Sequence, residues 1–372
     1  FLAKLGNFCC ESERGGRAWR MTTKCLLKDL LSLPCLADRT ASILEKPHAF
    51  KVQILFSEIV EGFLGSHLEQ HAFNVNDDTY FYPASTIKAC VAVSALETLR
   101  KIRNESGLPI GVNTKMIMHP TAGDPTAIET TVAQEMRKLF AVSDNEAFNR
   151  LLAFVGQREA NESMWRAGMP TARITHHLCR TGGDVRISPR IDLVSESGTY
   201  TMKERRSNLT MEFPPLKETD VGLGYLKGGV QQNTPMSFAQ KNRMSLPDFH
   251  RLIIKMTRPD LKMAGDDGSP FELDDSDRSF LMDCMKLFPR EAGFKDHGDD
   301  YCKLLLPGLS RVLPRKRWRI YNKIGRAYGF TVDTAYVTDT ESQKAFFVTA
   351  AIYTNSNQIL NDDKVVRILR CS

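Results

Sequence analysis

The sequence lacks any stretch that would suggest a membrane span. No run approaches the roughly 18 consecutive apolar residues that a spanning helix requires, because Lys, Arg or Asp interrupts the longest ones. Its 9 cysteines include no CxxC pair and no pair spaced with histidines for metal binding. Neither a zinc site nor a compact disulfide framework is therefore indicated, and we expect free thiols, with Cys90 among the buried ones.

A strong charge of one sign is also missing. The formal net charge of +6 is mild for 372 residues and is not typical of a dedicated nucleic-acid binder. The densest basic cluster spans 311–319, and we interpret it as a solvated loop that enters a strand. An anion-binding patch remains the alternative, since Lys323 follows closely.

The length and the apolar fraction of 42% allow one large domain or two ordinary ones with a substantial core. Residues 1–22 mix Gly, Cys and charge without periodicity, so we expect a poorly ordered extension. The stretch from Met21 looks superficially like a signal peptide, but Lys28 and Asp29 interrupt its apolar part. We expect an amphipathic helix there, and no targeting signal is visible.

Strand-like patterns lie at both ends of the remaining chain. Residues 50–60 and 67–75 are rich in branched and aromatic side chains and predict a hairpin. Three further runs, 317–325, 329–338 and 345–354, are separated by turn residues and predict a three-stranded meander. A last helix is expected over Leu360–Leu369.

Helical periodicity dominates between the two β regions. The predicted helices cover 86–101, 129–141, 146–155, 246–257 and 277–287. This pattern predicts an α+β fold, in which both chain ends build one antiparallel sheet of about five strands, flanked by helices. The catalytic domain would cover 23–372: 23–84 and 318–372 form the sheet part, 85–317 a mainly helical inserted subdomain, and about 180–240 an irregular insertion.

A first motif, Ser85-x-x-Lys88, stands where that inserted helical part begins. The two side chains are three residues apart and share one face of a helix. A lysine on a buried helix loses hydration, which lowers its pKa, and a neutral amine can then take the proton of a serine hydroxyl. The alternative is an N-cap serine followed by a lysine that reaches solvent along its stem.

Two further motifs are weak when taken singly. Ser143-Asp144-Asn145 joins two predicted helices, where Ser143 would relay a proton and Asn145 would bind a carbonyl, or where Ser143 and Glu146 would form a capping box. Lys323-Ile324-Gly325 lies on a strand. There Lys323 would attract a substrate carboxylate and Gly325 would admit the substrate backbone; otherwise the lysine faces solvent and the glycine marks a bulge.

Together, Ser-x-x-Lys, Ser-Asp-Asn and Lys-x-Gly occur in the order typical of the penicillin-recognising serine enzymes. The chain resembles the class A β-lactamase-like serine hydrolases, and YFYPASTIK, SDNEAFNRLL and NKIGRAYGFTVDTAYV all look like segments of that family. The resemblance covers roughly residues 50–170 and 318–370. It implies a small-molecule substrate, no metal or organic cofactor, a monomer, and a periplasmic or extracellular location.

The resemblance also assigns roles to residues. Ser85 would be the acylated nucleophile, Lys88 its base, and Ser143 the group that passes a proton to the leaving nitrogen. Asn145 and Lys323 would bind the substrate. Gly325, on the same strand as Lys323, would admit the substrate backbone. The backbone N–H of Arg326 would form the oxyanion hole together with that of Ser85.

Two departures leave the activity open. Ile324 replaces the usual threonine or serine between the strand lysine and glycine, and residues 173–192 lack the Glu-x-x-x-Asn pattern that activates the deacylating water in family β-lactamases. His176 or His177 could replace that glutamate, or could be an ordinary loop histidine. A β-lactamase is the first hypothesis. A penicillin-binding D-Ala-D-Ala peptidase or esterase is the second, and a non-catalytic sensor is the third.

Overall fold

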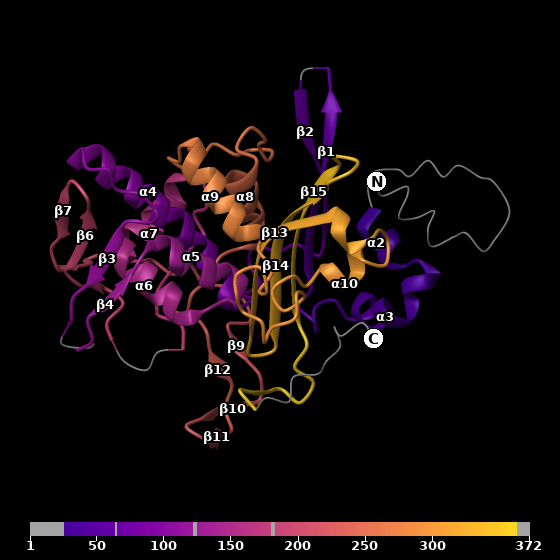
Figure 1. Cartoon of the computed structure of the whole chain (residues 1–372). Helices are drawn as coiled ribbons and strands as arrows, with labels where there is room; N and C mark the ends of the chain where they lie inside the picture. The colour runs from indigo at the N-terminus through magenta and orange to yellow at the C-terminus, as the bar shows by residue number, and fades with distance from the viewer. Residues whose placement is uncertain (1–25, 64, 122–124, 180–182, 363–372) are drawn as a thin grey trace.

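The computed structural model describes residues 26–63, 65–121, 125–179 and 183–362. A sheet occupies one half of the molecule and a group of helices the other (Figure 1). Helices α8 (Leu246–Thr257) and α9 (Asp275–Lys286) lie between them. Within the described residues, no helix combines the length and the apolarity that crossing a bilayer would need.

The central sheet confirms the predicted α+β fold. Its order is β13-β14-β15-β1-β2, and all neighbours are antiparallel. Because β1 pairs with β15, the two ends of the chain build one sheet, and the indigo and yellow strands lie side by side in Figure 1. The strands are β1 Gln53–Gly62, β2 Gly65–Phe73, β13 Trp318–Ala327, β14 Phe330–Asp339 and β15 Ala345–Tyr353.

Two short helices precede the sheet, where one amphipathic helix was predicted. Helix α2 covers Leu26–Leu31 and helix α3 covers Pro34–Glu45. Pro34 begins the second helix because proline suits the first helical turn but cannot continue the preceding one. The predicted extension 1–22 lies outside the described residues.

The predicted C-terminal helix Leu360–Leu369 is only partly described. Its first residue belongs to a short strand, β16 (Ile359–Leu360), which pairs in parallel with β10 (Gly224–Lys227). The remainder, from residue 363 on, lies outside the described residues.

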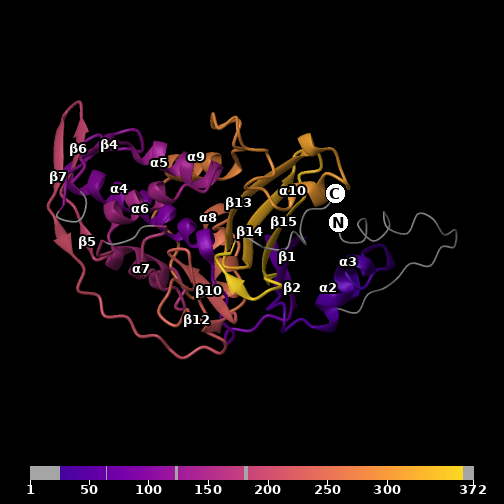
Figure 2. The same ribbon diagram turned by 90° about the horizontal axis from the view of Figure 1, so that it is seen from below.

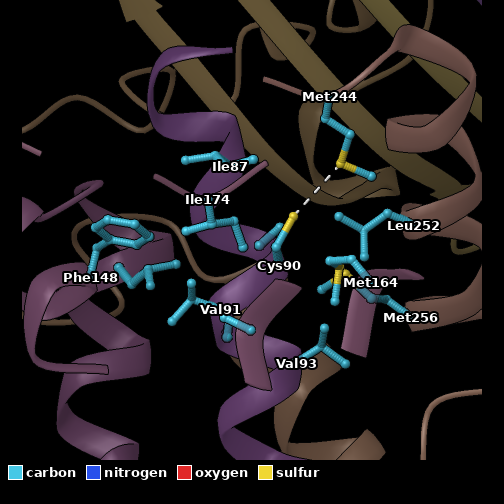
Figure 3. Packing of buried hydrophobic residues seen from close by; sticks show 14 of the residues in the cluster. Ile87, Cys90, Val91, Val93, Phe148, Met164, Ile174, Met244, Leu252 and Met256 are labelled. Atoms are coloured by element: carbon cyan, nitrogen blue, oxygen red, sulfur yellow. Dashed lines mark hydrogen bonds between the residues drawn. The ribbon is translucent and has the colours of Figure 1, made fainter. Parts of the chain in front are cut away.

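The helical half is organised around α4 (Lys88–Ser106). Its residues Val91, Ala95 and Leu99, which recur every four positions, are fully buried. Figure 3 shows Cys90 within the same core, with its Sγ 3.8 Å from the Sδ of Met244. The other helices are α5 Val132–Ala141, α6 Asn145–Val155, α7 Gln157–Arg166, α8 Leu246–Thr257, α9 Asp275–Lys286 and the short α10 Leu306–Leu309.

A second sheet, which the sequence patterns did not predict, lies at the far end of the helical half (Figure 2). Its order is β4-β3-β6-β7, with β3 Lys115–Met118, β4 Ile128–Thr130, β6 Ile191–Ser195 and β7 Gly198–Met202. Part of the insertion expected to be irregular therefore pairs with the helical region. It also contains β5 Ile187–Ser188, β8 Arg205–Arg206, β9 Asp220–Val221, β10, β11 Val230–Gln232 and β12 Met236–Ser237.

The segments just before and just after the insertion meet at an antiparallel bridge between Arg173 and Arg243, here called the neck of the insertion. The backbones of Arg173 and Arg243 exchange two hydrogen bonds, of 2.9 and 3.0 Å. Next to them, the buried amide of Asn242 accepts the backbone N–H of Thr175 at 2.7 Å. These bonds fix the loop that starts at Thr175 relative to Lys241, the residue that precedes Asn242.

Between the two halves, His250 of α8 should make stability depend on pH. Its ring bonds the uncharged hydroxyls of Ser57 at 2.7 Å and Thr349 at 2.9 Å, and burial lowers its pKa to about 3. An unfolded histidine has a pKa of about 6.5, so between these values only the unfolded chain takes up the proton. The free energy of unfolding should fall as the pH drops below about 6.5, by up to about 1.4 kcal/mol per pH unit.

Urea unfolding at pH 7 and pH 5 checks this expectation. The wild-type protein should lose about 2 kcal/mol more over that interval than His250→Gln, because glutamine does not titrate. Equal losses in the two proteins would show that His250 is not the group responsible.

Candidate active site

Ser85 lies in the 3-10 turn η1 (Ala84–Ile87), directly before α4. Residues three apart eclipse one another in such a turn, so Ser85 and Lys88 project from the same side. Ala84 has a φ of 49°, a conformation that costs free energy for a residue with a Cβ. Neither η1 nor α4 has a side-chain cap, so Ser85 is not an N-cap, and its hydroxyl has no hydrogen-bond partner among the described residues.

Lys88 is buried, with 0% of its surface exposed, so the alternative of a solvent-reaching lysine is wrong. Its Nζ donates to the backbone O of Ser143 at 2.5 Å, the backbone O of Asp144 at 3.1 Å and Oδ1 of Asn145 at 2.7 Å. Burial, and then the charge of Lys323, lower the pKa of Lys88 to about 6. The amine is thus shielded from water, although its hydrogen bonds are made to the Ser143–Asn145 loop and not to Ser85.

The loop between α5 and α6 presents Ser143 to two lysines. Ser143 adopts a φ of 57°, and its Oγ accepts from Nζ of Lys323 at 2.8 Å and lies 3.4 Å from Nζ of Lys88. The capping alternative for Ser143 is wrong, because the side chain of Asp144 caps α6 by accepting the N–H of Ala147 at 2.7 Å. The Ser143 hydroxyl is therefore placed to exchange a proton with either amine.

Lys323 is also buried, with 1% of its surface exposed, and does not face solvent. Its Nζ donates to its own strand at the backbone O of Ile324, at 2.8 Å, as well as to Ser143. Burial lowers its pKa to about 8, so it still carries a positive charge near pH 7. An amine that remains charged here gives the site a positive field.

A polar network supports β13 directly beside Lys323. Nζ of Lys303 donates to Oδ1 of Asn322 at 2.8 Å, and Nδ2 of Asn322 donates to Oδ1 of Asp333 at 2.9 Å. Burial raises the pKa of Asp333 to about 6 and lowers that of Lys303 to about 7. Since this carboxylate raises the pKa of Lys323, the network helps to keep Lys323 charged.

Gly325 brings β13 against the turn that carries Ser85. A Cβ at this position would lie 2.2 Å from the backbone O of Pro83 and 2.7 Å from the backbone N of Thr86. Pairing with β14 continues through Gly325 opposite Val332, so the glycine marks no bulge. Its demonstrable role is this close approach of strand and turn, and direct contact with substrate stays a prediction.

Replacing Gly325 by alanine should therefore displace the strand from the Ser85 turn. We expect Gly325→Ala to slow acylation of Ser85 at least about tenfold, because an ångström-scale misplacement of reacting groups costs about two powers of ten. Gly308→Ala is the matched control, since a Cβ there meets nothing within 4 Å. Stopped-flow acylation rates of both variants check this, and an unimpaired Gly325→Ala protein would contradict it.

A cavity of about 790 Å³ opens beside Ser85. Asn145 and Arg326, two of the predicted substrate-binding residues, line it together with Ser85. Lys88, Ser143 and Lys323 lie behind this lining and reach one another through the hydrogen bonds given above. The remaining described lining residues are Tyr82, Ala84, Thr175, His176, His177, Leu178, Cys179, Gly183, Asp184, Val185, Lys241, Ala327, Tyr328 and Asn361.

Comparison with known proteins agrees with this geometry. Residues 36–209 match the sequence model described as the beta-lactamase enzyme family. Over these residues the chain is similar to that family. No curated protein matches it.

Solved structures of PBP-A and of a β-lactamase have the same fold as this chain. A mutant of PBP-A, in an acyl-enzyme complex with penicillin G, is 15% identical with a TM-score of 0.50, and the match covers 92% of this chain and 93% of that one. A β-lactamase from Streptosporangium roseum is 17% identical with a TM-score of 0.50, covering 90% and 96% of the two chains. At such identities the likeness supports the fold alone.

The described part of this cavity wall, residues 175–179 and 183–185, differs from what a β-lactamase would need. Leu178 is buried there, and the side chain of Asn149 fixes its backbone, donating to the Leu178 O at 3.1 Å and accepting the Leu178 N–H at 3.0 Å. Among the described lining residues, the one carboxylate is Asp184, and Arg186 and Arg206 both donate to it. These bonds lower the pKa of Asp184 to about 2, which makes it a weak base.

Both histidines of the expected loop line the cavity. Nδ1 of His176 donates to the backbone O of His177 at 2.7 Å, and its ring stacks on Tyr82. Burial lowers the pKa of His176, so the ring is neutral near pH 7. Whether either histidine activates water stays a prediction.

The basic cluster 311–319 lies away from this cavity. Arg315 pairs with Asp299, while Arg317 pairs with Asp339 and Glu341. None of the cluster's residues is among the described residues that line the cavity. These ion pairs favour the interpretation of a solvated loop over an anion-binding patch.

The structure thus brings all the predicted site residues together around one cavity. The residues that the sequence patterns did not single out are Leu178, Lys241 and the aromatic wall of Tyr82 and Tyr328. They lie on loops or at strand ends, where no periodicity marks them. Two buried asparagines, Asn149 and Asn242, are the features that could have pointed to this loop. Their side chains bond the backbone of Leu178 and of Thr175, respectively.

Proposed function

We propose that the protein is a serine hydrolase that opens a lactam or a related amide through an acyl-enzyme at Ser85. One observation carries this proposal. Ser85, whose hydroxyl has no hydrogen-bond partner among the described residues, borders the cavity, and two buried lysines and a second serine meet directly behind it. A buried amine of lowered pKa activates a serine in the way that nucleophilic catalysis requires.

The protons of the first step balance among these groups. Neutral Lys88 takes the proton from Oγ of Ser85, and the oxygen attacks the carbonyl carbon while the amide C–N bond breaks. The leaving nitrogen takes a proton from Oγ of Ser143, which recovers one from Lys88 across 3.4 Å or from Lys323 across 2.8 Å. Lys323 and Asn145 would bind the carboxylate and the amide carbonyl of the substrate.

The oxygen anion that develops during attack needs hydrogen-bond donors. The backbone N–H groups of Ser85 and Arg326 are the proposed pair, because both residues border the cavity and Gly325 holds their segments together. Donors fixed in this way stabilise the transition state without reorganising.

A second candidate function rests on the wall around Leu178. Release of the acyl group requires a base that activates water, and the carboxylate of Asp184 is engaged by arginines. Slow release favours a penicillin-binding peptidase or esterase, whose natural substrate is a peptide or an ester. The acyl-enzyme complex of the PBP-A mutant with penicillin G is consistent with such chemistry on this fold.

Mass spectrometry of the protein mixed with penicillin G, followed over time, tests the proposal. A transient adduct on the peptide that contains Ser85 indicates a β-lactamase, and a lasting adduct indicates a penicillin-binding enzyme. If no adduct forms with penicillins of several side chains, the acyl-enzyme proposal fails and a non-catalytic sensor is favoured.

A further inference from the structure

Lys241 is a half-buried cation that has no counter-ion in the part of the chain that the structure describes. It lines the cavity beside Ser85, and its Nζ lies 5.7 Å from the centre of the Phe238 ring. Among the described residues, no carboxylate lies within ion-pair distance of it. Burial lowers its pKa, and no neighbouring carboxylate opposes that shift. A cation that is partly desolvated and unpaired is unfavourable unless an anion arrives.

The other charged groups of the cavity are either paired, as Asp184 is, or exposed to solvent, as Arg326 is. Asp184 accepts from Arg186 and Arg206, and Arg326 donates to the backbone O of Tyr301 at 3.2 Å. His176, whose pKa Lys241 lowers further, is neutral near pH 7. Lys241 is therefore the group of this cavity that best fits an added negative charge.

The position of Lys241 is fixed by its surroundings. The next residue, Asn242, is buried, and its Oδ1 accepts from the backbone N–H groups of Thr175 and His176. The Phe238 ring, over which Nζ of Lys241 lies, belongs to an aromatic cluster. It packs on Tyr82 at 5.3 Å and on Tyr328 at 5.2 Å between ring centres. The ammonium group thus stands on a rigid apolar support at the cavity wall.

Lys241 and Lys323 reach the site from different elements. Lys323 comes from β13, whereas Lys241 comes from the neck of the insertion. Resting on the proposed function, in which Lys323 attracts one substrate carboxylate, we propose that Lys241 binds a second anionic group carried on the acyl side chain. The substrate class is then a lactam or amide with two carboxylates.

Three penicillins that differ in one substituent test this inference. Carbenicillin, penicillin G and ampicillin carry a carboxylate, a hydrogen and an ammonium group, respectively, at the same side-chain carbon. We expect Ser85 to be acylated about tenfold faster by carbenicillin than by ampicillin at low salt, with penicillin G between them. Added salt should reduce this ratio, because it screens a partly exposed ion pair.

Substitutions of Lys241 test whether its charge causes the difference in acylation rate between carbenicillin and ampicillin. Lys241→Met retains an apolar stem over Phe238 and should reduce the carbenicillin-to-ampicillin ratio to about one, whereas Lys241→Arg should preserve it. Lys227→Met, on the exposed end of β10, is the matched control and should leave the ratio unchanged. A circular dichroism spectrum of each variant confirms that it is folded.

The outcomes separate this inference from the function on which it rests. Acylation by all three compounds at equal rates, or a ratio that survives in Lys241→Met, overturns the role of Lys241 and leaves the acyl-enzyme intact. For the opposite case, equilibrium binding of the three compounds to Ser85→Ala gives the same comparison without chemistry. If Ser85→Ala binds carbenicillin preferentially while the wild-type protein is not acylated, the anion site is supported and the proposed hydrolase function is refuted.

Discussion

Ser85→Ala should abolish covalent labelling by penicillin G and reduce any turnover at least roughly 10³-fold. The loss is expected to be this large because Lys88 and Ser143 contribute to acylation only through the serine oxygen, so removing that oxygen removes the combined effect. Stability should change little, since the Ser85 hydroxyl has no hydrogen-bond partner among the described residues.

The matched control is Ser106→Ala at the C-terminal end of α4. Its hydroxyl donates to the backbone O of Ile102 at 2.7 Å, inside the same helix and away from the cavity. Labelling of Ser106→Ala at the wild-type rate, together with an unlabelled Ser85→Ala, is the expected pair of results. Labelling that persists in Ser85→Ala would refute the assignment of the nucleophile.

On the second candidate function, in which release is slow, Leu178→Glu should convert a lasting acyl-enzyme into a transient one. Leu178 lines the cavity next to Ser85, and Asn149 holds its backbone at both the N–H and the O. A carboxylate at position 178 would supply a base to activate water, a role for which Asp184 is unsuited because arginines engage it. General bases typically accelerate such steps 10²–10⁴-fold. We expect release of the penicilloyl group from Ser85 to accelerate by about 10²-fold or more.

Leu178→Gln is the control for this change, because it has the same shape as glutamate without its charge. Both polar side chains replace a buried leucine and should destabilise the protein, so the two variants are compared at a temperature where both are folded. Equal release rates in Leu178→Glu and Leu178→Gln would show that a missing base does not limit release.

The sequence predicted the main sheet because its strands keep a recognisable composition. Residues 50–60 and the three runs after 317 alternate or concentrate branched and aromatic residues, and the structure confirms strands at each of them. Helix α8 was predicted at its observed bounds of 246–257, since its apolar residues keep the helical period.

Other elements escaped prediction for physical reasons. Helix α7 buries the polar side chains of Gln157, Asn161 and Ser163, so hydrophobic periodicity could not reveal its inner face. Asn161 satisfies its amide by bonding the backbone of Ile174, a contact that only the fold creates. The strands of the second sheet are at most 5 residues long, too short for an alternating pattern to stand out.

The site was predictable in its residues but not in its contacts. Ser85, Ser143 and Lys323 were identified from three short motifs, yet no local pattern indicated that Ser143 would lie between both lysines. Nor did it indicate that Gly325 faces the Ser85 turn. Long-range contacts between a loop, a strand and a turn depend on packing that no local pattern encodes.

The pH dependence of Ser85 acylation tests the central claim most directly. Lys88 must be neutral to take the proton, and its pKa of about 6 predicts that the rate rises with pH through this value. Lys323 must be charged to attract the substrate carboxylate, and its pKa of about 8 predicts that the rate falls again above it. The expected profile is a bell with its maximum near pH 7.

This profile is measured as the rate of penicillin G acylation from pH 5 to pH 9, with circular dichroism to confirm that the protein stays folded at each pH. A rising limb centred near pH 6 is the predicted result. A rate that does not change between pH 5 and pH 7, or that rises only near the ordinary pKa of a lysine, would contradict the claim that a buried, neutral Lys88 activates Ser85.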